Sequence, residues 1–349
     1  MTTTPRSANI HIALRLGRVL DDYEGEMNRI EAQSKTRALC ANVESVIKGK
    51  RQTVELAVTA LICNGQLLIE DVPGVGKTML ARALARSIDA SFQRIQFTPD
   101  LLPSDVTGVS IYDQKTGEFD FQPGPIFANI VLIDEVNRTT PRTQSSLLEA
   151  MEEHQVTVDG RTYRLPEPFF VMATQNPIEF YGTYPLPEGQ RDRFMISVGL
   201  GYPSMETEKE IATDQMLRHP IDTLEPVLNV AEVRELQAAV KEVHIEADLL
   251  DYAVSIVHAT RNHRALLLGS SPRGSLALVR SSQASALLDG RDYVTPDDVK
   301  EMACRVLPHR FVTRERARTS LRDATGIMAE VLDGVPVPVK VAELRGEET

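Results

Sequence analysis

Residues 66–88 read QLLIEDVPGVGKTMLARALARSI, and this stretch decides the fold. The short apolar run at 66–70 is typical of a buried parallel strand. Beyond the glycines, Leu80, Leu84 and Ile88 recur every four residues and form one face of a helix. A strand, a glycine-rich turn and a helix in this order predict an α/β fold whose turn can surround phosphate oxygens.

The turn has nearly the pattern G-x-x-x-x-G-K-[ST], but Asp71 stands where the pattern has its first glycine. That position only begins the turn, whereas Gly74 and Gly76 lie where phosphates would pass. Lys77 is expected to reach the terminal phosphates, and the Thr78 hydroxyl to bind Mg²⁺. An ordinary glycine turn is the alternative, and the strand and helix around the loop disfavour it. The predicted nucleotide-binding residues of the loop are Val72, Pro73, Gly74, Val75, Gly76, Lys77, Thr78 and Met79.

The length of 349 residues is enough for two domains, each with its own core. Further apolar runs at 92–97, 129–134 and 168–174 alternate with helical stretches. This alternation is typical of a parallel sheet covered by helices on both faces. We therefore expect a three-layer α/β core over residues 36–204.

Two β-hairpins are expected inside this core, at about 110–125 and 156–165, because each has a glycine turn between β-rich arms. Beyond them, residues 205–335 show helical signals alone, which predicts an all-α second domain. Residues 1–35 are interpreted as an N-terminal extension and 336–349 as a C-terminal tail.

The chain has 38 basic and 49 acidic residues, a net charge of −11, which disfavours broad binding to a nucleic-acid backbone. Its cysteines, Cys40, Cys63 and Cys304, are far apart and are interpreted as buried thiols, not as a disulfide framework or metal site. No apolar run is as long as a membrane span, and Arg15 and Arg18 interrupt the apolar stretch near the N-terminus. A cytoplasmic location is expected.

Polar side chains follow two of the predicted strands. IVLIDE (130–135) ends in Asp134, expected to hold Mg²⁺ partly through water, and Glu135, expected to polarise an attacking water. An acidic pair after a strand is common in solvated loops, but the phosphate-binding loop upstream favours the catalytic interpretation. The next strand, FFVMAT, leads to Asn176, which can orient that water or sense a γ-phosphate at the same sheet edge. A simple turn at Asn176 is the alternative.

Two arginines complete the candidate site. Ser271 and Pro272 are typical of a helix start, which places Arg273 in the first turn, where the helix dipole disfavours a cation by about 0.3–1 kcal/mol. A triphosphate nearby would reverse that sign. Arg193 follows a Pro- and Gly-rich loop and could project to a neighbouring subunit. A salt bridge to Asp192 or Glu188 is the alternative.

These pieces, in this order, resemble the AAA+ ATPases and, within them, the MoxR family. The resemblance covers about residues 37–338 and rests on LLIEDVPGVGKTMLARALA, GPIFANIVLIDEVNRTTPRTQSSLLEAMEE, MATQNPIE, YPLPEGQRDRF and SPRGSLALV. It implies that Lys77 is the Walker A lysine, Asp134 and Glu135 the Walker B pair, and Asn176 sensor 1. Similarly, Arg193 matches the arginine finger, with Arg191 as a competitor, and Arg273 matches sensor 2. The segment VIKGK resembles the part that packs on adenine, which makes Ile47 and Gly49 cofactor candidates.

The resemblance also implies a ring, hexameric in the family, with ATP and Mg²⁺ bound between subunits. Such proteins remodel or mature partner proteins, or insert metals and cofactors, often with a von Willebrand factor A-type partner. Three alternatives stay open: a nucleic-acid-dependent motor, a magnesium-chelatase-type motor subunit, and a nucleotide switch without turnover. The acidic charge disfavours the first of these.

Overall fold

The structure is a computed structural model that describes residues 27–176, 184–217, 219–314 and 321–338. Most of the expected N-terminal extension, most of the C-terminal tail and part of the loop before Arg193 therefore lie outside the described residues. Within the described ranges, each helix is too short or too polar to cross a membrane.

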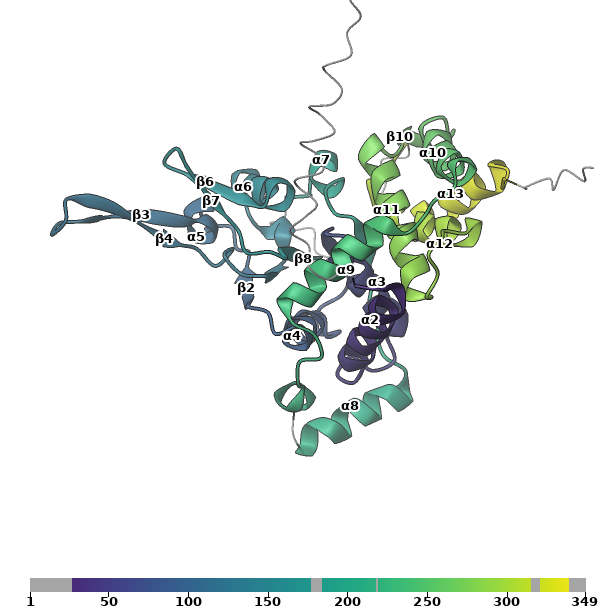
Figure 1. Ribbon diagram of the computed structural model, residues 1–349. Coiled ribbons are helices and arrows are strands. Elements are labelled where there is room, and N and C mark those ends of the chain that lie inside the picture. The colour runs from purple at the N-terminus through teal and green to yellow at the C-terminus, as the bar shows by residue number, and fades with distance from the viewer. Residues whose placement is uncertain (1–26, 177–183, 218, 315–320, 339–349) are drawn as a thin grey trace, which may run out of the picture.

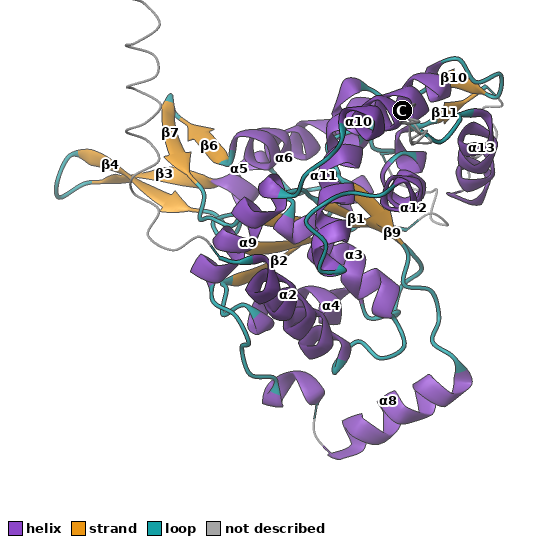
Figure 2. Cartoon of the chain, turned by 45° about the vertical axis from the view of Figure 1, so that its right-hand side comes forward, coloured by secondary structure: helices purple, strands orange, loops and turns teal. Residues whose placement is uncertain are grey.

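A five-stranded parallel sheet forms the centre of the molecule, as predicted (Figure 2). Its strands lie in the order β2-β5-β8-β1-β9, so the strand before the phosphate loop is flanked by β8 and β9. Because all five run the same way, their carboxyl ends share one edge, where Glu70 pairs with Gln175 and Gln96 with Asp134. The strands are β1 (Leu67–Glu70), β2 (Phe92–Gln96), β5 (Ile130–Asp134), β8 (Phe170–Gln175) and β9 (Ile196–Val198).

The two faces of the sheet bury two different apolar clusters, because successive strand residues point to opposite sides. Alternate residues such as Leu67 and Leu132 pack with helices α2 (Arg29–Glu44), α3 (Arg51–Ile62) and α4 (Lys77–Ser87). Their neighbours, such as Leu68, Val131 and Val171, pack on the other face with α5 (Pro103–Thr107) and α6 (Pro141–Glu153). The fold is thus the predicted three-layer α/β core.

Two β-hairpins lie side by side at one end of the sheet, close to the ranges 110–125 and 156–165 where the sequence predicts them (Figure 1). Strands β3 (Gly108–Asp113) and β4 (Glu118–Pro123) form a projecting arm, residues 108–123. Strands β6 (Gln155–Val158) and β7 (Arg161–Arg164) turn at Asp159-Gly160, where both residues have positive φ. Phe121 of the arm stacks on Tyr163 with ring centroids 3.9 Å apart, which joins the two hairpins.

The second domain is helical but not entirely so. Helix α12 begins as predicted, with Thr295 as its N-cap and Pro296 in the first position. The expectation of an all-α domain is wrong in one detail, since β10 (Leu266–Leu268) pairs antiparallel with β11 (Val312–Thr313). Strands of two or three residues are too short to show a period. The helices are α8 (Met205–Leu217), α9 (Val230–Glu242), α10 (Ala247–Arg261), α11 (Pro272–Leu288), α12 (Pro296–Val306) and α13 (Leu321–Gly334).

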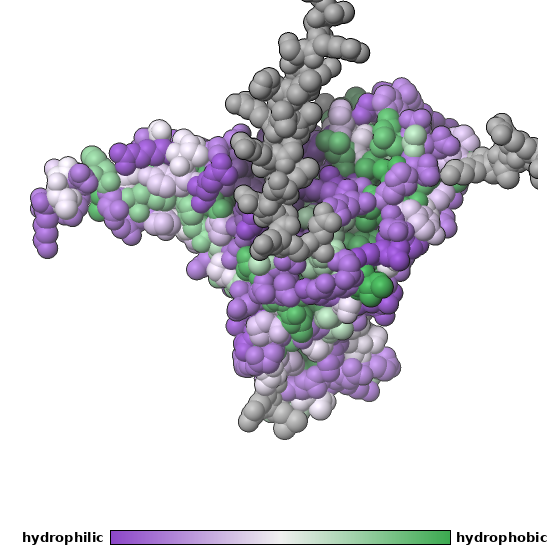
Figure 3. Space-filling view, viewed as in Figure 1, coloured by the Kyte–Doolittle hydropathy of each residue, from purple (hydrophilic) through white to green (hydrophobic). Residues whose placement is uncertain are grey.

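Helix α2 begins at Arg29, so the expected boundary at residue 35 falls inside a helix. Asn28 caps this helix, with its side chain accepting from the Glu31 N–H, and Ala32 is fully buried. Helices α2 and α3 also contact α9 and α11 of the second domain, so they join the two domains. Figure 3 shows apolar and polar side chains interspersed over the arm and the body.

Candidate active site

The phosphate loop leaves open space above its backbone. Gly74 and Gly76 have φ of +83° and +96°, and nothing lies within 4 Å of where a Cβ would be at either position. Helix α4 begins directly afterwards at Lys77, so its N-terminal N–H groups face the same space. The Lys77 ammonium donates to the Asp71 carbonyl oxygen at 2.8 Å. The loop therefore fits a phosphate chain, and its lysine is already directed along it.

A cavity of about 240 Å³ lies above this loop and brings the predicted groups together. Because the strand ends share one edge, β5 and β8 deliver their polar residues next to α4. The cavity is lined by Pro73, Gly74, Gly76, Lys77, Thr78, Met79, Arg94, Gln96, Asp134, Glu135, Thr174 and Asn176. Hydroxyl and carboxylate oxygens are the ligands that Mg²⁺ prefers, so Thr78 and Asp134 fit that ion.

Asp134 is 7% exposed and is held from two sides. Arg94 on β2 donates its Nε to Oδ2 at 2.6 Å, and the Thr174 hydroxyl donates to Oδ1 at 3.2 Å. The guanidinium compensates the charge of a nearly buried carboxylate. A bound cation would take over that compensation.

Glu135 has the left-handed backbone conformation, φ 59°, which costs a non-glycine residue about 1–3 kcal/mol. Its N–H donates to the Thr174 hydroxyl at 3.0 Å, which helps to hold this turn. Its carboxylate accepts from the Gln96 amide at 2.7 Å. Arg138 forms an ion pair with the same carboxylate, with its Nε 3.4 Å from Oε2. Glu135 is thus a strained residue at the cavity wall, whose carboxylate is held by one amide and one guanidinium.

A second cavity, about 400 Å³, adjoins the first and shares Gly74, Gly76 and Met79 with it. Ile47 and Val75 line it, together with Tyr202 and Pro203 beyond β9. Its lining is mostly apolar, as a flat heterocyclic base requires. Ile47, which the sequence predicts as a cofactor residue, thus lines this second cavity.

Two predicted cofactor residues border neither cavity. Gly49, φ +70°, lies against Thr207, whose Oγ1 would be 3.1 Å from an added Cβ. Val72 donates its N–H to the Asp71 carboxylate at 2.8 Å. Both are neighbours of lining residues, so they shape the loop and the pocket wall from behind.

Arg193 and Arg273 also lie outside the phosphate cavity, and one carboxylate holds them both. Glu152, at the end of α6, binds Arg193 Nη1 through Oε2 at 2.5 Å and Arg273 Nη2 through Oε1. Arg273 lies in the first turn of α11, as predicted, with Ser271 as the N-cap. The negative charge that offsets its unfavourable place on the helix dipole is, in this chain, Glu152.

Arg191 is placed differently. It donates to the Phe311 carbonyl of the second domain at 3.2 Å. Its charge lies close enough to Glu70 to oppose the effect of burial, which raises the pKa of that carboxyl. Arg191 thus joins the two domains, and Arg193 is the arginine of this loop that shares a carboxylate with Arg273.

Between these arginines, Asp192 links the loop to the second domain. Its carboxylate accepts from Arg310 Nε at 3.1 Å and from the Ser271 hydroxyl at 2.7 Å. Arg310 is 4% exposed, and burial lowers its pKa to about 10. A movement of α11 would therefore be transmitted to the Arg193 loop. The alternative considered for Arg193, a salt bridge to Asp192, is not formed, because Asp192 pairs with Arg310 instead.

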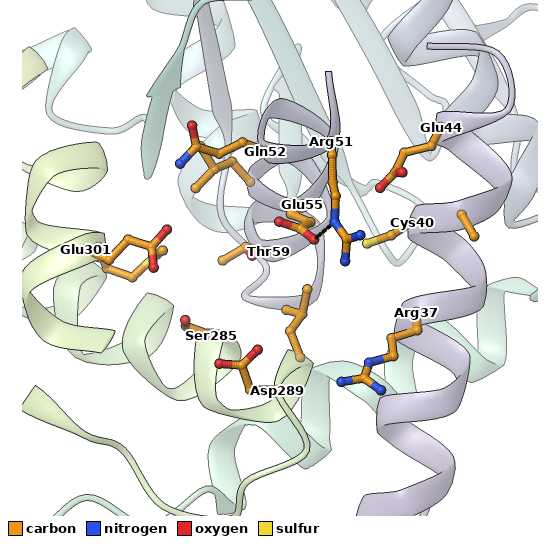
Figure 4. Close-up of a pocket in the computed structure, with 14 residues that line it drawn as sticks. Arg37, Cys40, Glu44, Arg51, Gln52, Glu55, Thr59, Ser285, Asp289 and Glu301 are labelled. Carbon is orange, nitrogen blue, oxygen red and sulfur yellow. Dashed lines mark hydrogen bonds and ion pairs between the residues drawn. The ribbon is translucent and has the colours of Figure 1, made fainter. Parts of the chain in front are cut away.

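A separate cavity, about 340 Å³, lies where α2 and α3 face α11 and α12 (Figure 4). Arg51 and Glu55 form an ion pair at its wall, 2.8 Å apart. Cys40 also lines it, and burial raises the pKa of this thiol to about 12, so it is protonated at neutral pH. The cavity shares no lining residue with the two described above, and it lies at the interface between the two domains.

Sequence reasoning did not single out Arg94, Gln96 or Glu152. A signal existed for the first two, because residues two apart in a strand share a face, and the strand at 92–97 was predicted. Glu152 carried no such signal, since its partners are 41 and 121 residues away in the chain.

Comparisons with known proteins agree with this geometry. The family model "ATPase family associated with various cellular activities (AAA)" matches residues 66–196, and the model "AAA lid domain" matches residues 258–330. The chain is 35% identical to a crystal structure from Cytophaga hutchinsonii described as a candidate ATPase. The TM-score is 0.82, with 94% of this chain and all of the other covered.

Three relatives cover most of the chain. The uncharacterized protein YeaC of Bacillus subtilis is 54% identical over 304 residues, 87% of this chain and 95% of that one. Chaperone MoxR1 of Mycobacterium tuberculosis is 42% identical over 305 residues, 85% of this chain and 80% of that one. Protein MoxR of Paracoccus denitrificans is 30% identical over 295 residues, 78% and 86% of the two chains. The loop, the acidic pair, the parallel sheet, the lid domain and these relatives together establish that the chain belongs to the MoxR family of AAA+ ATPases.

Proposed function

We propose that this ATPase works as a hexameric ring in which ATP hydrolysis drives the remodelling or maturation of partner proteins, or the insertion of a metal or cofactor into them. The observation that carries the proposal is the pair Arg193 and Arg273 on Glu152, outside the phosphate cavity of their own chain. Among the described residues that line this cavity, the one arginine is Arg94, and it is paired with Asp134. We therefore expect a neighbouring subunit to supply the guanidinium that stabilises the transferring phosphoryl group.

Within one subunit, the loop residues bind and orient the nucleotide. The backbone N–H groups at Gly74 to Thr78 hold phosphate oxygens, and Lys77 exchanges its contact with the Asp71 carbonyl for the terminal phosphates. Mg²⁺, held by Thr78 and partly through water by Asp134, would neutralise charge on the phosphates. Ile47, Val75 and Met79 pack against the base.

Glu135 then polarises the attacking water, and Asn176 orients it. Gln96 holds the Glu135 carboxylate at 2.7 Å until the water is in place. The strained turn at Glu135 fixes the direction of the carboxylate, which general-base catalysis requires.

Arg193 serves the cavity of the next subunit, with Arg273 beside it. A guanidinium supplied by a partner stabilises the charge on the transferring phosphoryl group and is worth about 10³–10⁵ in rate. Because Asp192 ties the Arg193 loop to the lid, hydrolysis and lid movement are coupled.

The projecting arm supports a protein partner over a nucleic acid. Val109, Ile111, Tyr112 and Phe119 are all at least 42% exposed on it. The arm carries three carboxylates and one lysine, so a phosphate backbone would be repelled. Exposed aromatic and aliphatic side chains on an acidic arm suit a protein surface, and a von Willebrand factor A-type protein is the partner we propose.

Two variants test the proposal. Lys77→Ala should abolish ATP binding in calorimetry, and Glu135→Gln with ATP should form a six-subunit particle in light scattering. A von Willebrand factor A-type protein whose gene neighbours the gene for this protein should bind Glu135→Gln in the presence of ATP and should not bind Lys77→Ala. A chain that stays monomeric with ATP contradicts the ring. ATPase stimulation by DNA that is lost with added salt favours a nucleic-acid motor instead.

A further inference from the structure

We propose that Asp71, the residue in place of the usual first loop glycine, is a positioning residue that couples the phosphate loop to the linker beyond β9. When nucleotide binds, Asp71 thereby positions Tyr202 and Pro203, which line the cavity assigned to the base. The proposal rests on nucleotide binding at the loop described above.

The Asp71 carboxylate accepts three backbone hydrogen bonds. Oδ1 accepts the N–H of Val72 at 2.8 Å, within the loop itself. Oδ2 accepts the N–H groups of Leu200 and Gly201, both at 2.6 Å. The residue is 9% exposed, so these bonds are largely shielded from water. One side chain thus joins two segments about 130 residues apart in the chain.

The backbone of Asp71 is tied to the catalytic edge as well. Its N–H donates to the Gln175 carbonyl at 3.1 Å, directly before Asn176, and its carbonyl accepts from Lys77 at 2.8 Å. When the Lys77 ammonium leaves for a phosphate, this carbonyl loses its donor. Nucleotide entry therefore changes the surroundings of Asp71 directly.

The linker bound by Asp71 leads into the base pocket. Gly201 has φ +61°, which turns two successive N–H groups toward one carboxylate oxygen. Tyr202 and Pro203 follow and line that pocket, and the Tyr202 carbonyl accepts from Lys50 at 2.8 Å. Helix α8 begins two residues later, at Met205. Asp71 therefore lies between the loop that binds phosphate and the segment that starts the lid.

A glycine at position 71 could supply the backbone contacts but none of the three side-chain bonds. Hydrogen bonds to a charged group are among the strong ones, and each is worth about tenfold in an equilibrium constant. Asparagine is nearly isosteric, but it has a single acceptor oxygen, which cannot accept from Val72 and from Leu200 and Gly201 at the same time. Its oxygen is also neutral and therefore accepts more weakly than a carboxylate. The aspartate is therefore required for the coupling, not for the turn.

The test uses the full chain, ADP with Mg²⁺, calorimetry and amide hydrogen exchange at Leu200 and Gly201. In the unchanged chain, ADP should slow exchange at both amides. In Asp71→Asn, both amides should exchange faster, ADP should no longer slow them, and the Kd for ADP should rise about tenfold. Asp298→Asn is the matched control, because it removes another buried carboxylate, which caps α12. That control should lose thermal stability yet keep both the Kd and the ADP-dependent protection.

The outcomes separate this proposal from the proposed function. If the unchanged chain does not bind ADP, the assigned nucleotide site is wrong. If it binds ADP but Asp71→Asn keeps its affinity and protection, the coupling role of Asp71 is overturned. If Asp71→Asn does not fold, the wild-type protein alone tests the proposal. ADP that leaves amide exchange at Leu200 and Gly201 unaltered in the wild-type protein also overturns the coupling role of Asp71.

Discussion

Replacing Glu152 by glutamine should make the ring easier to assemble. In the free chain Glu152 binds both Arg193 and Arg273. In the proposed ring both guanidinium groups leave Glu152 and bind the phosphates of the nucleotide in the next subunit. Glutamine keeps the size of the side chain but removes its charge. The substitution therefore weakens the two ion pairs of the free subunit, which are absent from the assembled ring. The free energy of the ring itself is unaffected.

The size of the effect follows from the exposure of the partners. The side chains of Arg193, Arg273 and Glu152 are 23%, 43% and 31% exposed, so solvent screens both pairs. An ion pair of this kind is worth about 0.5 kcal/mol. Two of them amount to about 1 kcal/mol, or about fivefold in an equilibrium constant.

The assay is the specific ATPase rate as a function of protein concentration. For Glu152→Gln, the concentration at half-maximal rate should fall about fivefold, with the rate at saturation unchanged. Glu153→Gln is the control, since the Glu153 carboxylate accepts from Gln155 instead. A half-maximal concentration that is unchanged or higher would refute the reasoning. A tenfold loss of rate at saturation would do the same, because it would mean that Glu152 positions the arginines for catalysis.

Two further predictions concern single residues. Glu135→Gln should bind ATP with unchanged affinity but hydrolyse it about 10²–10⁴-fold more slowly, because the carboxylate acts on water; normal turnover in a phosphate-release assay would remove Glu135 from the mechanism. Burial lowers the pKa of His309 well below 6.5, so the unfolded chain takes up a proton there that the folded chain does not, and stability falls as pH drops. Between pH 7.5 and 5.5 this residue should cost at most about 1.4 kcal/mol of unfolding free energy, the limit for an imidazole that stays neutral in the folded protein, and His309→Gln should lack this loss in urea titrations; equal pH slopes in both proteins would contradict it.

The parts of the site that are local in sequence could be predicted. The phosphate loop needs a strand, two glycines and a helix start within about 20 residues, and all of these are visible in the printed chain. Asp134 and Asn176 could be placed beside it because parallel strands end at one edge, and both line the cavity. Whether these residues act as assigned stays a prediction.

The parts that depend on packing could not be predicted. Gln96 reaches Glu135, and Asp71 reaches Leu200, only after the sheet has formed. Strand β9 (Ile196–Val198) has three residues and no detectable period. The start of α2 did carry a local signal, since Asn28 precedes Glu31 by the capping spacing, but the helix has almost no amphipathic pattern to support it.

The central claim is that one subunit completes the hydrolytic site of the next. Arg193→Ala and Lys77→Ala should each be inactive alone, since one lacks the finger and the other the phosphate loop. In rings formed from equal amounts of the two variants, an interface is complete where the intact phosphate loop of an Arg193→Ala subunit meets the intact Arg193 of a Lys77→Ala subunit. This happens at about a quarter of the interfaces. The ATPase rate of the mixture should therefore return to as much as about a quarter of the unchanged protein. If native mass spectrometry shows mixed rings and no activity returns at any ratio, Arg193 does not act across the interface.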